Sequence, residues 1–447
     1  MTSCRRWWLA ALAAIAVSLL LPGVGAAAGR SSGKDTGPDS TTSPSGSAHL
    51  HNPAITGADC PPGLACRVVP AAYEQNSSSP FDYGNYDIAT RPSDGLDIRF
   101  VVIHDTEVGY DDTVALFQNP LAYVSAHYVT RSSDGQVTEM VSPNNVAWQA
   151  GNWWVNTHSV GIENEGFALR GYQWYTPQLY RSLARLTKYV ADRYGVPLDR
   201  EHLIGHDQVP GTFGIVNQRN MHWDPGPYFD WAHFMSLVGA SITPAGGDRT
   251  GRVVTIDPNF ATNTPPLAGQ PQESANFVYL HSGPSEGSPL VGDVSLAGTG
   301  LEPNGVGTTR ADDWGDKAVT GQTFAVADRQ GDWTAIWYGG QRAWFHDGGV
   351  TIPGSGTLVT PKAGLSSIPV YGRAYPESVS TATLPYTIPA GQVYVAKDLV
   401  QSDYYDAPTY TTNVSDHHVV KGTSQFYVIS FDHRLAFLSA DDVDIVK

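Results

Sequence analysis

Two histidines and one aspartate lie at the ends of three well-separated segments of the sequence. These residues are His104 in VVIHDTE, His206 in LIGHDQV and Asp224 in HWDPGP. Two imidazoles and a carboxylate from different parts of a fold form a three-ligand zinc site whose fourth position stays open for water. An open position is the requirement of a hydrolytic zinc, whereas a structural zinc has four protein ligands. The pattern therefore predicts metal-assisted hydrolysis.

The elements that must position these residues are visible around them. The apolar run FVVI predicts a buried strand that places His104 at its carboxyl end, where sheet proteins often hold their ligands. Residues 203–205 form a second short strand, which delivers His206. The run HYVTRSSDGQVTEMV alternates on both sides of Asp134-Gly135 and predicts a hairpin.

The strongest helix signal is the segment TPQLYRSLARLTKYVADRYG. Thr176 is expected to cap its first turn, Pro177 to take the first helical position and Gly195 to end it. Its apolar residues share one face at helical spacing, which predicts packing rather than chemistry. They are Leu179, Leu183, Leu186, Val190 and Tyr194.

Three further motifs lie between the two histidines, in the order SAHYVTRSSDGQV, AWQAG and SVGIENEG. The whole series resembles the zinc-dependent N-acetylmuramoyl-L-alanine amidase family, whose fold is shared with peptidoglycan recognition proteins. The resemblance covers residues 95–235, about a third of the chain, and the motifs occur in the family's order. It implies an α/β fold, with a mixed β-sheet flanked by helices and Zn2+ bound in a groove on one face.

The resemblance also implies a role for each site residue. His104, His206 and Asp224 would bind the zinc ion. Glu163 would be the general base that takes a proton from the attacking water. His222 stands where many relatives have a lysine, and its imidazole would stabilise the developing oxyanion. The family's substrate is peptidoglycan, which is the expected partner.

Two alternatives stay open. Glu165 lies two residues after Glu163 on the same face of an extended segment, so either carboxylate is a candidate base. His222 lies two residues before Asp224 and is a competing metal ligand for the same reason. The spacing between His206 and Asp224 is longer than the compact family pattern, and GTFGIVNQRNM looks like an inserted loop.

The sequence departs from the family's pattern at two positions. Ala126 stands where some relatives carry a catalytic tyrosine, which puts more of the expected chemistry on Glu163. Gln149 stands where relatives often have a histidine; its neutral amide can still hydrogen-bond a sugar or peptide, so the departure bears on substrate preference and not on activity. His127 is expected to be a groove or structural residue rather than a ligand. Trp148, Trp153 and Trp154 are candidates for an aromatic wall of the groove. For Trp148, packing in the core is an equal alternative.

The start of the chain predicts export. Residues 1–28 combine a basic start, an apolar stretch and a run of small residues, which is typical of a cleaved signal peptide rather than a transmembrane helix. Arg5 and Arg6 also fit a twin-arginine signal, so both export routes stay open. We therefore expect a secreted protein associated with the cell wall, with no membrane contact after cleavage.

Cysteine content and charge agree with export. Cys60 and Cys66 remain after signal cleavage, and an oxidising compartment favours a disulfide between them. The net charge is -16 at pH 7, and loss of Arg5 and Arg6 makes it more negative still. A nucleic-acid partner is excluded by this balance, because binding to phosphates requires a basic surface.

The rest of the chain is predicted to divide by composition. The segment GDWTAIWYGGQRAWF resembles the strand, glycine turn and strand of bacterial SH3-like domains, and an irregular β-sandwich is the alternative. The predicted regions are a signal peptide at 1–28, a flexible linker at 29–59, an ordered extension at 60–94, the zinc amidase domain at 95–241, a Pro/Gly-rich linker at 242–270, one SH3-like module at 271–358 and a second at 359–447.

Together these features predict a secreted, monomeric zinc amidase. It would cleave the amide bond between the lactyl group of N-acetylmuramic acid and the L-alanine of the stem peptide. A C-terminal tail joined by the linker would hold it on the wall and be dispensable for small soluble substrates. The alternatives are a recognition protein that binds peptidoglycan without cutting it, and a zinc peptidase that cuts another wall bond.

Overall fold

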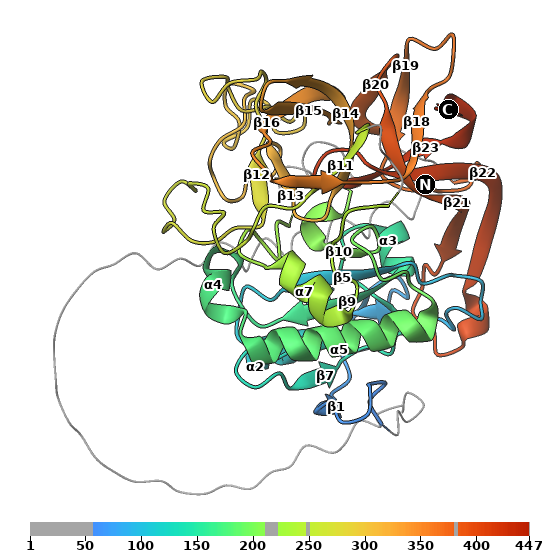
Figure 1. The fold of residues 1–447 in the computed structure, drawn as a ribbon. Coiled ribbons are helices and arrows are strands. Elements are labelled where there is room, and N and C mark those ends of the chain that lie inside the picture. The colour runs from blue at the N-terminus through green and yellow to red at the C-terminus, as the bar shows by residue number, and fades with distance from the viewer. Residues whose placement is uncertain (1–56, 211–221, 247–250, 380–382, 447) are drawn as a thin grey trace, which may run out of the picture.

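The computed structural model describes residues 57–210, 222–246, 251–379 and 383–446. The predicted signal peptide and almost all of the predicted linker at 29–59 lie outside the described residues. Within them, an N-terminal α/β domain carries the motifs, and a β-rich C-terminal region follows it (Figure 1). Both features of the predicted fold class are therefore confirmed.

A mixed six-stranded sheet forms the centre of the N-terminal domain, in the order β1-β7-β6-β9-β5-β10. The pairs β6–β9, β9–β5 and β5–β10 are parallel. The pair β6–β7 is the antiparallel hairpin expected around the Asp-Gly turn. The strands are β1 (Cys66–Val68), β5 (Phe100–Asp105), β6 (Tyr128–Thr130), β7 (Val137–Glu139), β9 (Ser159–Asn164) and β10 (Leu203–Gly205).

The long helix α5 (Pro177–Tyr194) covers one face of this sheet and lies beside α7 (Trp231–Val238) (Figure 1). Its predicted ends are confirmed: the Thr176 side chain accepts a hydrogen bond from the backbone of Leu179, and Gly195 ends the helix with a left-handed φ of 74°. The shorter helices are α2 (Tyr110–Phe117), α3 (Trp153–Thr157), α4 (Gly171–Trp174), and the 3-10 turns η2 (Ala168–Arg170) and η3 (His206–Gln208).

The segment predicted as an ordered extension is built into this domain. Its strand β1 is the edge strand of the main sheet, and Cys60 and Cys66 form the expected disulfide beside it. Arg91 is 1% exposed and donates hydrogen bonds to several main-chain carbonyls, among them that of Ser159. Two short antiparallel pairs complete this part of the domain. Strand β2 (Glu74–Gln75) pairs with β3 (Tyr83–Gly84), and β4 (Tyr86–Asp87) pairs with β8 (Val146–Ala147).

The C-terminal region contains a five-stranded sheet, a two-stranded sheet and a seven-stranded sheet. The five-stranded sheet has β16 (Gln341–His346), β15 (Trp333–Tyr338), β14 (Thr323–Gln330), β11 (Val253–Ile256) and β17 (Thr351–Pro353). The pair is β12 (Phe277–Tyr279) with β13 (Lys317–Val319). The seven-stranded sheet has β20 (Thr383–Pro389), β19 (Ser367–Tyr371), β23 (Leu435–Ser439), β22 (His418–Ser430), β21 (Tyr394–Asp406), β18 (Thr357–Pro361) and β24 (Val443–Ile445).

One predicted boundary needs correction. The range 242–270 was expected to be a linker, but it contains β11, which pairs with both β14 and β17 inside the five-stranded sheet. Val253, Val254 and Ile256 in this strand are buried. The abundant Pro and Gly around the strand hid it, because four residues are too few to show a clear alternation of apolar and polar positions.

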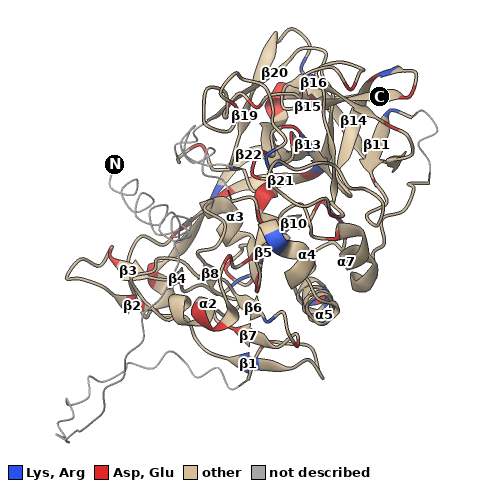
Figure 2. Ribbon diagram, turned by 90° about the vertical axis from the view of Figure 1, so that its left-hand side faces the viewer, with Lys and Arg blue, Asp and Glu red and all other residues tan. Residues whose placement is uncertain are grey.

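The expected arrangement of a tethered tail is also wrong, because the C-terminal region shares its core with the N-terminal domain. Trp154 on α3 is 1% exposed and packs edge-on against Phe437 at a ring separation of 4.9 Å. Its neighbour Trp153 donates a hydrogen bond of 3.0 Å to the carbonyl of Tyr405 on β21. Figure 2 shows α3 lying between the main sheet and the β21–β22 ribbon. Both tryptophans were candidates for the substrate groove, and both are core residues instead.

A second contact fixes the segment that precedes α7. The side-chain nitrogen of Asn276 donates hydrogen bonds to the carbonyls of Gly226 and Phe229, both at 2.9 Å. Its backbone N–H donates to the carbonyl of Pro227, also at 2.9 Å. Asn276 is 1% exposed. The C-terminal region therefore braces the turn that follows Asp224.

Among the described residues, no helix has the length and hydropathy that would let it cross a lipid bilayer.

The shared core predicts that the N-terminal domain does not survive alone. Truncation after residue 245 would expose Trp153 and Trp154 to water, each worth about 1.5–3 kcal/mol when buried. A domain is stable by only about 5–15 kcal/mol. We expect the truncated protein to aggregate or to melt at least 10 °C below the full chain, as measured by circular dichroism. A truncated protein that is soluble, melts cooperatively and keeps the full chain's melting temperature would contradict the shared core.

Candidate metal centre

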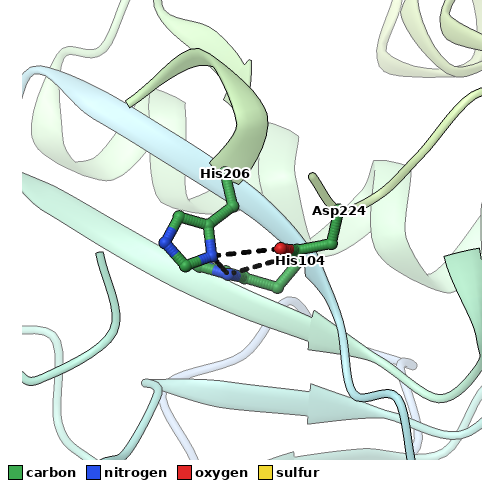
Figure 3. Close-up of side chains that lie close together, drawn as sticks. All are labelled: His104, His206 and Asp224. Carbon is green, nitrogen blue, oxygen red and sulfur yellow. Dashed lines mark hydrogen bonds and ion pairs between the residues drawn. The ribbon is translucent and has the colours of Figure 1, made fainter. Parts of the chain in front are cut away.

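The two histidines come from neighbouring parallel strands. His104 is the fifth residue of β5, and His206 follows β10 directly, at the start of η3. Because the strands pair with Gly205 opposite Ile103, both histidines leave the sheet at the same edge. Asp224 reaches this edge from the loop that precedes α7, and Figure 3 shows the three side chains pointing toward one another.

The ligand atoms of the three residues are within contact of one another. The Nδ1 atom of His104 lies 3.0 Å from Nδ1 of His206 and 3.2 Å from Oδ2 of Asp224 (Figure 3). Nδ1 of His206 is 3.2 Å from Oδ1 of Asp224. Ligands about 2.0–2.1 Å from a tetrahedral zinc are separated from one another by roughly 3.3 Å, so this donor set fits the ion. Among the described residues, this is the group of histidine, cysteine and acidic side chains that converges in this way.

Burial and charge both act on these side chains. His104, His206 and Asp224 are 1%, 6% and 7% exposed. Burial by itself would raise the pKa of Asp224, but the two histidines outweigh burial and hold that pKa well below its usual value. The aspartate is therefore held as a carboxylate, which is the form that binds a metal ion.

Glu163 is the cross-strand neighbour of His104, because β5 and β9 are paired with these two residues opposite each other. Its Oε2 atom is buried and has no hydrogen-bond partner among the residues that the structure describes. Burial, followed by the charge of Asp224, raises the pKa of Glu163 well above its usual value. Asp105 and Asp207 nearby also keep a buried oxygen of this kind, so it is the place of Glu163 opposite His104 that makes a functional role the candidate.

The alternative carboxylate, Glu165, has a structural task. One of its oxygens accepts a hydrogen bond of 3.0 Å from the backbone of Tyr110, and the other accepts one of 2.8 Å from the backbone of Ser132. Both oxygens are thus used to hold the start of α2 and the β6–β7 hairpin. This geometry favours Glu163 over Glu165 as the candidate base.

His222 lies beside the cluster rather than in it. Its ring stacks on that of His206 at 4.3 Å and 9°, while its Nδ1 is 3.9 Å from Oδ1 of Asp224. The side chain of His222 is 48% exposed. It therefore borders the site on the side that is open to solvent, where a substrate would approach. The loop predicted as an insertion, 211–221, lies outside the described residues.

His127 and Trp148 serve the structure of the domain. His127 is fully buried, its Nδ1 accepts a hydrogen bond from the backbone of Gly161, and its Nε2 lies 3.0 Å from a guanidinium nitrogen of Arg91. Burial and the adjacent arginine lower the pKa of His127 well below its usual value. Trp148 is half-buried and donates a hydrogen bond of 2.6 Å to Asp87.

Gln149 is the site residue whose role the sequence did not reveal. Its amide oxygen accepts a hydrogen bond from Nε2 of His104, on the side of the ring opposite the ligand atom. Gln149 is 6% exposed, and both polar atoms of its amide are used inside the domain, the nitrogen on Ser159 and the oxygen on His104. The signal available in the sequence was the AWQAG motif, which says nothing about the direction of the side chain.

Comparison with known proteins identifies a related family. Residues 94–227 match the family model described as N-acetylmuramoyl-L-alanine amidase. The N-acetylmuramoyl-L-alanine amidase A of Achromobacter lyticus is 34% identical over 169 residues, which cover 36% of this chain and 91% of that protein.

Two further relatives match a smaller part. The 1,6-anhydro-N-acetylmuramyl-L-alanine amidase AmpD of Citrobacter freundii is 36% identical over 124 residues, 26% of this chain and 59% of that protein. A crystal structure of an AmpD derivative is 28% identical, with a TM-score of 0.29, and covers 39% of this chain and 94% of that one. The match to amidase A along nearly its whole length shows that the chain belongs to the N-acetylmuramoyl-L-alanine amidase family.

Proposed function

We propose that this protein is a secreted, zinc-dependent amidase of peptidoglycan. It cleaves the amide bond that joins the lactyl group of N-acetylmuramic acid to the L-alanine of the stem peptide. The observation that carries this proposal is the convergence of His104, His206 and Asp224 beside the unpartnered carboxylate oxygen of Glu163. The named activity of the relatives supports the choice of bond.

The residues of the chain divide the chemistry between them. His104, His206 and Asp224 would hold the ion, which when bound supplies Lewis acidity for a carbonyl group and a lower pKa for water. Glu163 accepts the proton of the attacking water and returns it to the leaving amine of L-alanine as the C–N bond breaks. His222, half exposed at the open side, donates an N–H toward the oxygen that gains negative charge.

The two other functions fit the site less well. A protein that binds peptidoglycan without cutting it needs neither three converging ligands nor a buried carboxylate next to them. A zinc peptidase would use the same residue types, so the bond cut distinguishes it from an amidase. That the C-terminal sheets are SH3-like and contact the cell wall stays a prediction.

The metal and the bond are tested together on the full-length protein. We expect one zinc per chain by elemental mass spectrometry, and stem peptides with a free L-alanine amino group released from purified peptidoglycan. His104→Ala removes one of three ligands and should lose both the zinc and the product. His233→Ala, which changes an exposed histidine on α7, is the control and should keep both. Cleavage between two amino acids instead would identify a peptidase.

Glu163 and Glu165 provide a matched pair of substitutions. Glu163→Gln should bind zinc normally and lose roughly 10²–10⁴-fold in turnover, the usual contribution of a positioned acid–base group. Glu165→Gln loses one of two structural acceptors for the backbone of Tyr110 and Ser132 but removes no group aimed at the cluster, so turnover should change by less than about 10-fold. Steady-state rates on a soluble muropeptide measure both. The reverse ranking of the two variants would show that Glu165 is the base.

Export is proposed from the signal-like residues 1–28 and is supported by the Cys60–Cys66 disulfide, which an oxidising compartment favours. Protein isolated from culture medium should begin at Gly29, as read by N-terminal sequencing. Changing Arg5 and Arg6 to lysine should block export if the twin-arginine route is used and leave it intact otherwise. Recovery of the protein only inside cells, with residues 1–28 still attached, would reject secretion.

A further inference from the structure

Gln149 connects the metal-binding edge of the sheet to the interior of the domain. Its amide oxygen accepts a hydrogen bond from Nε2 of His104, and its amide nitrogen donates one of 2.7 Å to Oγ of Ser159. Ser159 is fully buried and begins β9. The series His104, Gln149, Ser159 is therefore continuous and shielded from water.

The far end of this series fixes the direction of every hydrogen bond in it. The hydroxyl of Ser159 donates its single proton to the carbonyl of Val155 at 2.6 Å. Its oxygen can therefore act only as an acceptor toward Gln149, so the NH2 group of the amide must face Ser159. The amide oxygen then faces His104. Because an amide oxygen is only an acceptor, Nε2 of His104 must carry a proton.

The position of the amide is held from several sides. A β-carbon at Gly161 would lie 2.7 Å from the side-chain carbon of the amide and 2.8 Å from its oxygen, so only glycine leaves room for Gln149 there. The backbone N–H groups of Gln149 and Ala150 both donate to the side-chain oxygen of Asn156, at 3.2 and 2.7 Å. This cradle explains the glycine in SVGIENEG and leaves the amide little freedom to turn.

We propose that Gln149 is a positioning residue that keeps the proton of His104 on Nε2 and its lone pair on Nδ1, facing the metal. A neutral imidazole has one donor and one acceptor nitrogen, and the hydrogen bond at one nitrogen decides the role of the other. Nδ1 is the atom that lies 3.0 and 3.2 Å from the other two ligands. The inference deepens the proposed function and depends on it for the identity of the ion.

The first test needs no metal and so stands apart from the proposed function. Long-range proton–nitrogen NMR spectra of the full-length, metal-stripped protein, labelled with 15N in histidine, distinguish a protonated Nε2 from a protonated Nδ1. His104→Ala assigns the signal. We expect Nε2 of His104 to carry a proton in the parent protein, whether or not Nδ1 also carries one beside Asp224. In Gln149→Leu, which has no acceptor, a fraction of His104 should lose the proton from Nε2. A parent protein in which Nε2 of His104 is unprotonated would overturn the proposal.

The second test measures zinc affinity by competition with a chelator. Loss of such an outer hydrogen bond typically costs 10–100-fold in metal affinity, and we expect this loss in Gln149→Leu. Gln149→Glu keeps an oxygen acceptor for Nε2 of His104, and the hydroxyl of Ser159 can turn from the carbonyl of Val155 to donate to the second carboxylate oxygen. We expect this variant to recover affinity to within about 5-fold of the parent. Rescue by glutamate but not by leucine is an effect that general damage to the core does not produce.

A matched control separates affinity from stability. Gln322 is 3% exposed and makes two hydrogen bonds within the C-terminal region, to the backbone of Val319 and of His433. Gln322→Leu should lower the melting temperature as Gln149→Leu does and leave zinc affinity unchanged. Equal zinc affinity in Gln149→Leu and the parent would reject the positioning role. Absence of zinc binding by the parent itself would reject the proposed function and leave the NMR result to decide the tautomer.

Discussion

The parallel pairing of β5 with β9 and β10 is the constraint on which the site depends. Strand β9 places Glu163 opposite His104, and β10 brings His206 to the same edge of the sheet. Because side chains alternate between the faces of a strand, a shift of one residue in either pairing would turn His206 or Glu163 away from the cluster. The helix α5 and its apolar face stabilise the sheet that holds this register, and they take no part in the chemistry.

Burial of so many polar groups at one edge is costly unless each has a partner. The structure meets this cost differently for each residue. Asp224 is balanced by two imidazoles, Glu165 by two backbone N–H groups, and His104 by the amide of Gln149. Glu163 alone among these acidic groups keeps an oxygen without a partner. Asp105 and Asp207 at the same edge also keep one such oxygen, so the position of Glu163 opposite His104 is what makes it the candidate base.

The C-terminal region belongs to the same structural unit as the metal site. Asn276 holds the turn after Asp224 through three hydrogen bonds. Trp153 and Trp154 join α3 to the seven-stranded sheet, through Tyr405 and Phe437. The ligand with the least support from the central sheet is thus braced by residues more than fifty positions further along the chain. The C-terminal sheets therefore support the N-terminal domain that carries the cluster.

Local periodicity and capping residues were enough to predict helix α5, and the order of the motifs was enough to imply the mixed sheet and the candidates for the cluster through the family resemblance. The disulfide followed from two remaining cysteines and an expected oxidising compartment. The choice between Glu163 and Glu165 as candidate base needed the three-dimensional contacts. The two residues are both glutamates on one face of the same segment, but they have different hydrogen-bond partners. The tertiary structure also decided the direction of Gln149, the burial of Trp153 and Trp154, and the place of β11 in a sheet. Each of these depends on contacts between segments far apart in the chain, which periodicity and motif order do not encode.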